Sequence, residues 1–174
     1  MKTRNLRIKL FGIFLFLGHF FTVAGGPEPP TDYTLHTLYI FNFTKFVEWP
    51  TGEKSVKIGV VDSESAESFF SKMAKAKSKP GAEISVINTK DASELGSCQV
   101  IFIPSGSTSM ATKLITNFND RPVLIVTEDA DLTKMGASVS FKIVASKLRF
   151  QINEEGIKGK GLKISSSLLT MAEK

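Results

Sequence analysis

The spacing of apolar residues changes along this chain, and each change predicts a different element. From Tyr33 to Trp49 apolar residues recur at helical spacing, which predicts an amphipathic helix that stops at Trp49-Pro50. Thr31 or Asp32 is expected to cap this helix. Six residues are expected on its buried face: Leu35, Leu38, Tyr39, Phe43, Phe46 and Val47.

Four short apolar runs follow, and none of them alternates cleanly with polar residues. They are residues 56–61, 84–87, 98–103 and 122–127. Runs of this kind are typical of strands that are covered on both faces, as in a parallel sheet. Helical spacing over residues 64–77 and 107–118 places a helix in two of the connections, which favours βαβ units.

The last third of the chain has a different pattern. Apolar and polar residues alternate on both sides of Ala145-Ser146, which predicts two half-exposed strands in an antiparallel hairpin. Because Ala-Ser is a poor two-residue turn, we expect a longer loop there. The glycine-rich residues 156–161 are expected to form a turn before a final helix over about residues 165–172. The sequence therefore predicts an α/β fold: a single compact domain with a mainly parallel central sheet flanked by helices, a C-terminal antiparallel hairpin and a final helix.

The first 24 residues have the order of a secretory signal peptide. Four basic residues come first, an apolar stretch follows and small residues end it, so cleavage is expected near Ala24 or Gly25. The stretch from Leu10 to Ala24 spans 15 residues, whereas a helix needs roughly 20 to cross a membrane. An uncleaved anchor is therefore the less favoured alternative. The expected organisation is a signal peptide at 1–24, an extended lead-in at 25–34 and one domain at 35–174.

Charge is best counted after this segment has been removed. The 174 residues carry 22 Lys and Arg against 17 Asp and Glu, a formal net charge of +5. Without residues 1–24 the chain has 18 basic and 17 acidic residues, so its net charge falls to about +1. The composition then no longer favours a nucleic-acid partner, and a soluble periplasmic protein is expected.

Few residues of the exported chain are suited to catalysis or to metal binding. His36 is its only imidazole, and a Ser/His/Asp triad would need His36 with a serine such as Ser107. No nucleophile elbow, zinc-protease motif or phosphate loop occurs. The lone Cys98 opens an apolar strand, where a buried thiol is expected. We therefore expect no catalytic residues, no metal and no cofactor, and hydrogen bonds from His36 and Asn42 to neighbouring backbone.

A ligand crevice is the better structural candidate, because open α/β sheets bind ligands at the carboxyl ends of their strands. The residues expected there are Asp62, Ser63, Ser105, Gly106, Ser107, Thr127 and Glu128. The helix that begins near Ser107 offers free backbone N–H groups to an anion, but Ser and Thr also serve simply as caps there. The lysines at 72, 75, 77 and 79 are expected to form a solvated helix face.

Several segments together resemble one known family. They are LYIFNFTKFVEWP at 38–50, SCQVIFIP at 97–104, RPVLIVTE at 121–128 and LRFQINEEGIKGKGLKISSSLLTMA at 148–172. These segments are similar to the YfiR family of exported bacterial proteins. The most recognisable positions are Asn42, Trp49, Pro50, Phe150, Asn153, Leu162, Leu168 and Leu169.

The resemblance implies a non-enzymatic regulator without a cofactor. The best-known member of the family is a periplasmic repressor that holds the periplasmic domain of a membrane-anchored diguanylate cyclase inactive, which lowers cyclic-di-GMP and biofilm formation. An outer-membrane protein releases it, and the family fold can form a homodimer. A membrane-anchored sensor protein is thus the expected partner here, and nucleic acid is not.

Two points remain open within this resemblance. Well-studied members carry paired cysteines, whereas only Cys98 occurs here, so an intrachain disulfide does not carry over and pairing between chains would need an exposed thiol. Leu168 and Met171 are candidate partner contacts if the last helix binds, although Leu168 and Leu169 equally suit a core. The alternative function is a periplasmic module that binds a small anion or a cell-wall fragment in the strand-end crevice.

Overall fold

A computed structural model describes residues 31–52 and 54–173, so the predicted signal peptide and most of the lead-in lie outside the described residues. The elements are α1 (Thr34–Phe46), β1 (Val47–Glu48), β2 (Val56–Val60), α2 (Glu64–Lys77), β3 (Ile84–Asn88), α3 (Ala92–Leu95), β4 (Val100–Ile103), α4 (Thr108–Asn117), β5 (Leu124–Thr127), the 3₁₀ helix η1 (Ala130–Thr133), β6 (Val139–Val144), β7 (Lys147–Ile152), α5 (Glu154–Gly159), β8 (Lys163–Ile164) and α6 (Ser166–Met171).

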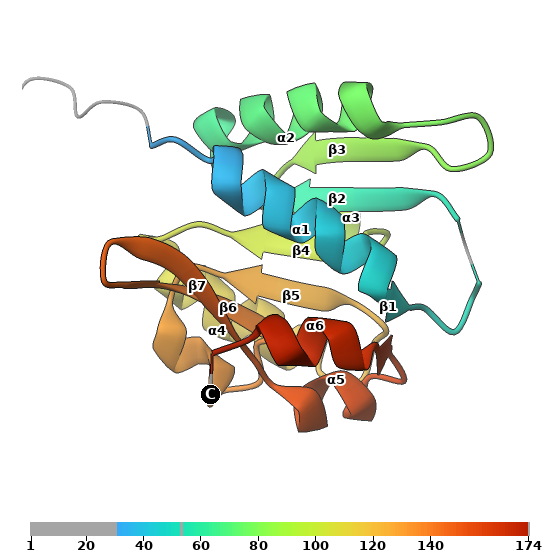
Figure 1. Ribbon diagram of the computed structural model, residues 1–174. Helices are drawn as coiled ribbons and strands as arrows, with labels where there is room; N and C mark the ends of the chain where they lie inside the picture. The colour runs from blue at the N-terminus through green and yellow to red at the C-terminus, as the bar shows by residue number, and fades with distance from the viewer. Residues whose placement is uncertain (1–30, 53, 174) are drawn as a thin grey trace, which may run out of the picture.

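The central sheet has six strands in the order β3-β2-β4-β5-β6-β7 (Figure 1). The first five in this order are parallel, and β7 pairs antiparallel with β6. The chain runs from β2 to β3 on one side and then crosses to β4 on the other side of β2. Strand order therefore reverses at β2 and β4, and the predicted α/β fold class is confirmed.

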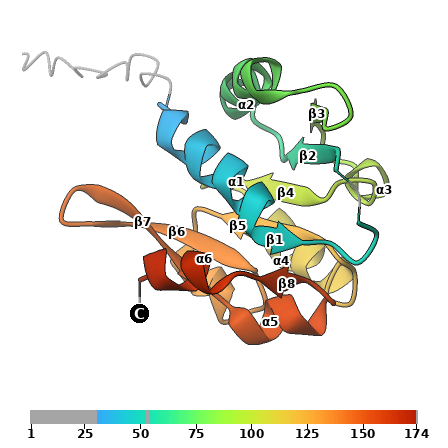
Figure 2. The same ribbon diagram turned by 45° about the vertical axis from the view of Figure 1, so that its right-hand side comes forward.

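Helices cover both faces of this sheet. The helices α1, α2 and α6 lie on one face and α4 lies on the other, as Figures 1 and 2 show. Leu95 of α3 and Leu132 of η1 belong to the same buried cluster as α4. Each face has its own core cluster, with Phe43, Phe102 and Phe141 on the α1 side and Leu114 and Phe118 on the α4 side. Every residue of β4 and β5 is buried, which explains why these strands lack alternation in the sequence.

The first helix differs from its prediction in length and in orientation. It ends at Phe46, because residues 47–48 leave it to pair antiparallel with residues 163–164. Its buried residues are His36, Thr37, Ile40 and Phe43. Leu35 and Leu38, expected on the buried face, are 52% and 43% exposed. The helix is therefore rotated relative to the predicted wheel, and it presents two leucines to the surface.

Two local predictions near the C-terminus are wrong. The hairpin turn has only two residues, since Val144 pairs with Lys147 directly across it. Ala145 and Ser146 adopt φ values of 48° and 60°, the left-handed region that a type I′ turn requires at both positions. The stretch expected as a glycine-rich turn is partly helical, because α5 extends through Gly159. The Asn153 side chain caps α5 by accepting a hydrogen bond from Gly156 N at 2.8 Å.

Candidate functional site

The predicted strand-end residues divide into two groups in the structure. After β2, Asp62 Oδ2 lies 3.0 Å from Lys90 Nζ, and Ser63 caps α2 by accepting a hydrogen bond from Ala66 N at 3.1 Å. After β4 and β5, Ser105 N donates to Glu128 Oε2 at 2.7 Å. The fold thus brings Ser105 and Glu128 together, as the crevice hypothesis expected of residues at neighbouring strand ends.

The remaining three predicted residues have less direct roles. Thr127 is buried, and its hydroxyl accepts a hydrogen bond from Asp129 N. Gly106 is exposed with a φ of 89°, a conformation that suits glycine at this turn. Ser107 directly precedes α4, but its side chain makes no capping hydrogen bond. The simple capping role that we considered for Ser107 is therefore absent.

A buried His–Glu pair dominates this edge of the sheet. His36 Nε2 on α1 lies 3.0 Å from Glu128 Oε1, and both side chains are largely buried. Three aromatic rings surround the imidazole: Phe141 at 4.9 Å, Tyr33 at 5.4 Å and Phe102 at 6.0 Å between ring centroids. His36 was expected to bond to backbone, and this expectation is wrong. The imidazole instead ties the first turn of α1 to a carboxylate that follows β5.

The pKa values of Glu128 and of the nearby Tyr33 are both shifted. Burial alone would raise the pKa of Glu128, but the hydrogen bonds from His36 and Ser105 outweigh it and hold this pKa below its usual value. Tyr33 shows the opposite effect, because burial and then the nearby Glu128 charge raise the pKa of its phenol. Glu128 is therefore a buried anion that the protein stabilises with its own donors.

This arrangement assembles neither a triad nor an open anion site. His36 Nε2 faces Glu128, and His36 Nδ1 is a buried atom without a hydrogen-bond partner in the described part of the chain. A serine nucleophile would have to bond to that nitrogen. The backbone N–H of Ser105, which an external anion would need, is already donated to Glu128. The geometry thus favours a structural role for the pair, in positioning α1 on the sheet.

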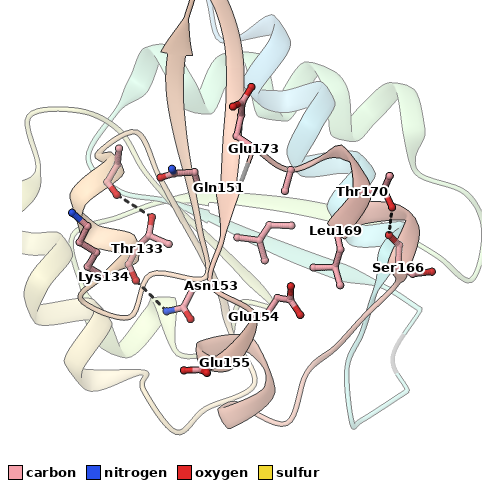
Figure 3. Close-up of a pocket in the computed structure, with 13 residues that line it drawn as sticks. Thr133, Lys134, Gln151, Asn153, Glu154, Glu155, Ser166, Leu169, Thr170 and Glu173 are labelled. Atoms are coloured by element: carbon pink, nitrogen blue, oxygen red, sulfur yellow. Dashed lines mark hydrogen bonds between the residues drawn. The ribbon is translucent and has the colours of Figure 1, made fainter.

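A large open groove lies elsewhere, between η1, the end of β7, the start of α5 and α6 (Figure 3). Its volume is about 1130 Å³. Figure 3 shows Thr133 and Lys134 on one side and Leu169, Ser166 and Thr170 on the other. Its ionisable lining residues are Lys134, Glu154, Glu155 and Glu173. The Asn153 side chain joins two of its walls, because its Nδ2 donates to Thr133 O at 3.1 Å.

A profile described as YfiR/HmsC-like matches residues 33–173. The chain belongs to the YfiR/HmsC-like family. The match includes every helix and strand that the structure describes. It therefore applies to the whole domain, including the His36–Glu128 pair and the groove of Figure 3.

Comparison with solved structures shows the fold alone. This YfiR/HmsC-like chain is similar to a conserved domain protein from Vibrio cholerae O1 biovar El Tor, with a TM-score of 0.55 and 15% identity over 82% of this chain. The chain spans 59% of the length of that protein. An ABC domain in complex with L-Trp from Streptococcus pneumonia matches with a TM-score of 0.47 and 13% identity, covering 67% of this chain and 54% of its own. Comparison with curated proteins gives no match.

The recognisable family positions serve mainly the packing of this YfiR/HmsC-like domain. Phe150 and Leu162 are buried in the α1-side core, and Asn42 and Trp49 are half-buried. Pro50 is exposed in the turn after β1. Leu168 is 1% exposed, so it belongs to the core and cannot serve as a partner contact. Met171, the other candidate contact, is 51% exposed.

Cys98 is a buried free cysteine. Cys98 is 3% exposed, and burial raises the pKa of its thiol. A disulfide between chains, which needed an exposed thiol, is therefore incompatible with this packing.

In the described residues no group of three His, Cys, Asp or Glu side chains is placed to hold a metal ion. Over the same residues, no helix has the length and apolar character to span a membrane.

Proposed function

We propose that this protein is a periplasmic, non-enzymatic regulator that binds the extracytoplasmic domain of a membrane signalling protein and holds it inactive. The expected partner is a diguanylate cyclase, so repression would lower cyclic-di-GMP. The observation that carries this proposal is the family match over residues 33–173. Family membership supports a regulatory role in general, and the choice of partner is the finer part of the proposal.

The physical requirement for such a regulator is differential binding. A repressor shifts its partner toward the inactive conformation only if it binds that conformation more tightly, by about 1.4 kcal/mol for each tenfold shift. Affinity for the partner is also higher when the regulator is already ordered, because less of the binding free energy is lost in ordering it. The two buried clusters and the His36–Glu128 pair hold the described residues in one packed arrangement.

The proposal is tested by deleting the gene and measuring intracellular cyclic-di-GMP. We expect the nucleotide level to rise on deletion and to return when the full chain is supplied. A chain that lacks residues 1–24 is the matched control, and it should fail to restore repression because it is not exported. Cross-linking of the tagged full chain should recover a membrane-anchored cyclase. Unchanged nucleotide levels and no recovered cyclase would refute the proposal.

A further inference from the structure

The helices α1 and α2 lie on the same face of the sheet (Figures 1 and 2). A smaller groove lies between them. Its volume is about 230 Å³, and its lining residues are Thr34, Thr37, Phe69, Lys72, Met73 and Ala76. Phe69, Met73 and Ala76 are spaced four and three residues apart, so they form one stripe along α2. The floor of this groove is therefore mainly apolar and open to the surface.

Three lysines lie in or beside the groove, and Asp32 lies at its end, where its Oδ1 accepts a hydrogen bond from Thr34 N at 2.9 Å. Lys72 lines the groove, and Lys45 and Lys77 each lie over the ring of Phe41, one turn beyond the groove. Their Nζ atoms lie 4.5 and 5.8 Å from the ring centroid. None of the three lysines takes part in an ion pair among the residues that the structure describes. The groove thus combines an apolar floor with three lysines that form no ion pair in the described residues.

One exposed apolar side chain, Leu38, extends this surface along α1. Leu38 is 43% exposed, and it lies four residues after Thr34 and three before Phe41, on the same side of the helix. Large apolar side chains that gather at the surface commonly mark an interaction site. A bound segment that fills the groove with one side can therefore contact the surface around Leu38 with its adjacent side.

We propose that the α1–α2 groove binds an acidic, amphipathic helix from the extracytoplasmic domain of the membrane partner. This inference rests on the proposed function and specifies its contact surface. The volume of the α1–α2 groove is below the roughly 300 Å³ at which small-ligand pockets begin. The groove therefore suits the anchoring side chains of a peptide better than an enclosed ligand. A helix laid between two helices places apolar residues at i, i+3 and i+4 on the floor. Carboxylates on its flanks then meet Lys45, Lys72 and Lys77.

Site-specific photo-cross-linking in cells tests this surface. A photoreactive amino acid is placed at Ala76, inside the groove, or at Thr116, which is exposed on α4 on the opposite face of the sheet. We expect Ala76 to cross-link to a membrane signalling protein, and mass spectrometry to place the cross-link in an acidic amphipathic segment of its extracytoplasmic domain. Thr116 should give no such product.

Charge reversal provides the matched comparison. Lys72→Glu should reduce the cross-linked product from Ala76 by roughly five- to tenfold, because it replaces an attraction by a repulsion. Lys113→Glu makes the same change at an exposed residue of α4 and should leave the product from Ala76 unchanged. Equal thermal midpoints for the two variants exclude loss of folding as the cause.

The outcomes separate this inference from the proposed function. A cyclase cross-linked from Thr116 and not from Ala76 would overturn the groove assignment while leaving the regulator intact. Products from Ala76 that contain only lipid or a second copy of this chain would also overturn it. An acidic segment captured at Ala76 from a protein outside signalling would support the groove and refute the proposed function.

Discussion

Lys160 is a buried lysine that the sequence gives no reason to expect. It is 3% exposed, and its Nζ reaches only Val123 O at 3.5 Å and Ser138 Oγ at 3.4 Å. No carboxylate lies within ion-pair distance of it in the described residues. Burial lowers the pKa of this lysine from 10.5 to about 8. The protein therefore keeps a charge in its interior at neutral pH, at a cost to its stability.

The sign and size of this cost follow from the two pKa values. Below pH 8 Lys160 is charged in both states, and its desolvation lowers the free energy of unfolding by about 3 kcal/mol. Between pH 8 and 10.5 the unfolded chain binds more protons than the folded chain, so stability increases with pH. From pH 7 to pH 10 the gain is roughly 2 kcal/mol.

Lys160→Met isolates this contribution, because methionine has a similar length and no charge. We expect the variant to be more stable than the parent at pH 7, by about 1 to 2 kcal/mol after the lost hydrogen bonds are counted. Relative to the parent, the variant should lose roughly 2 kcal/mol between pH 7 and pH 10, so that its advantage disappears. Urea unfolding of both proteins over this pH range measures the difference, in which the effects of other titrating groups cancel.

The control is Lys158→Met, since Lys158 is exposed on the same helix and pairs with Glu154 at 3.6 Å. Its stability difference from the parent, measured over the same pH range, is the reference for the Lys160→Met difference. If the stability difference between Lys160→Met and the parent did not change between pH 7 and pH 10, the Lys160 amine would have its ordinary pKa. The conclusion that Lys160 is desolvated would then be wrong.

Three further predictions concern other features of the domain. Glu128→Gln should lower the free energy of unfolding by about 2 kcal/mol at pH 7; because the folded pKa of Glu128 is lowered, this difference should vanish in urea titrations as the pH falls through that pKa. Ala145→Asn combined with Ser146→Gly should raise the urea midpoint by an amount equivalent to about 1 kcal/mol, since both positions have positive φ; no gain would argue against a two-residue turn. Cys98 should react with a thiol reagent about a hundredfold more slowly in the folded chain than in urea, and equal rates would contradict its burial.

The order of elements could be predicted because burial leaves a direct mark on the sequence. The strand Val100–Ile103 is wholly apolar and Leu124–Thr127 is apolar except for its last residue, and both strands are covered on both faces. The alternation on either side of residue 145 likewise identified the antiparallel edge. The short elements left no such mark. The strand Val47–Glu48 forms only because residues 163–164 lie beside it, which is a contact between distant parts of the chain.

The site was harder to predict for the same reason. Ser105 and Glu128 were grouped correctly because parallel strands end at one edge of the sheet, and this rule needs no side-chain detail. The pairing of His36 with Glu128 depends on how α1 is rotated on the sheet. The apolar wheel placed Leu35 and Leu38 inward, whereas the packing of Ile40 and Phe43 turns them outward. Helical periodicity fixes a face only to within about one side chain, so the polar contacts at its margin remain undetermined.

Net charge gave an incomplete description of the surface. A net charge of about +1 for residues 25–174 removed the case for a polyanion partner, but it averages over regions that differ in sign. Lysines 45, 72 and 77 lie around the α1–α2 groove, whereas Glu154, Glu155 and Glu173 line the groove of Figure 3. At physiological salt an exposed charge acts over about 8 Å, which is less than the width of a domain. A partner that docks on one groove therefore meets the local charge, so a nearly neutral protein can still select an acidic helix.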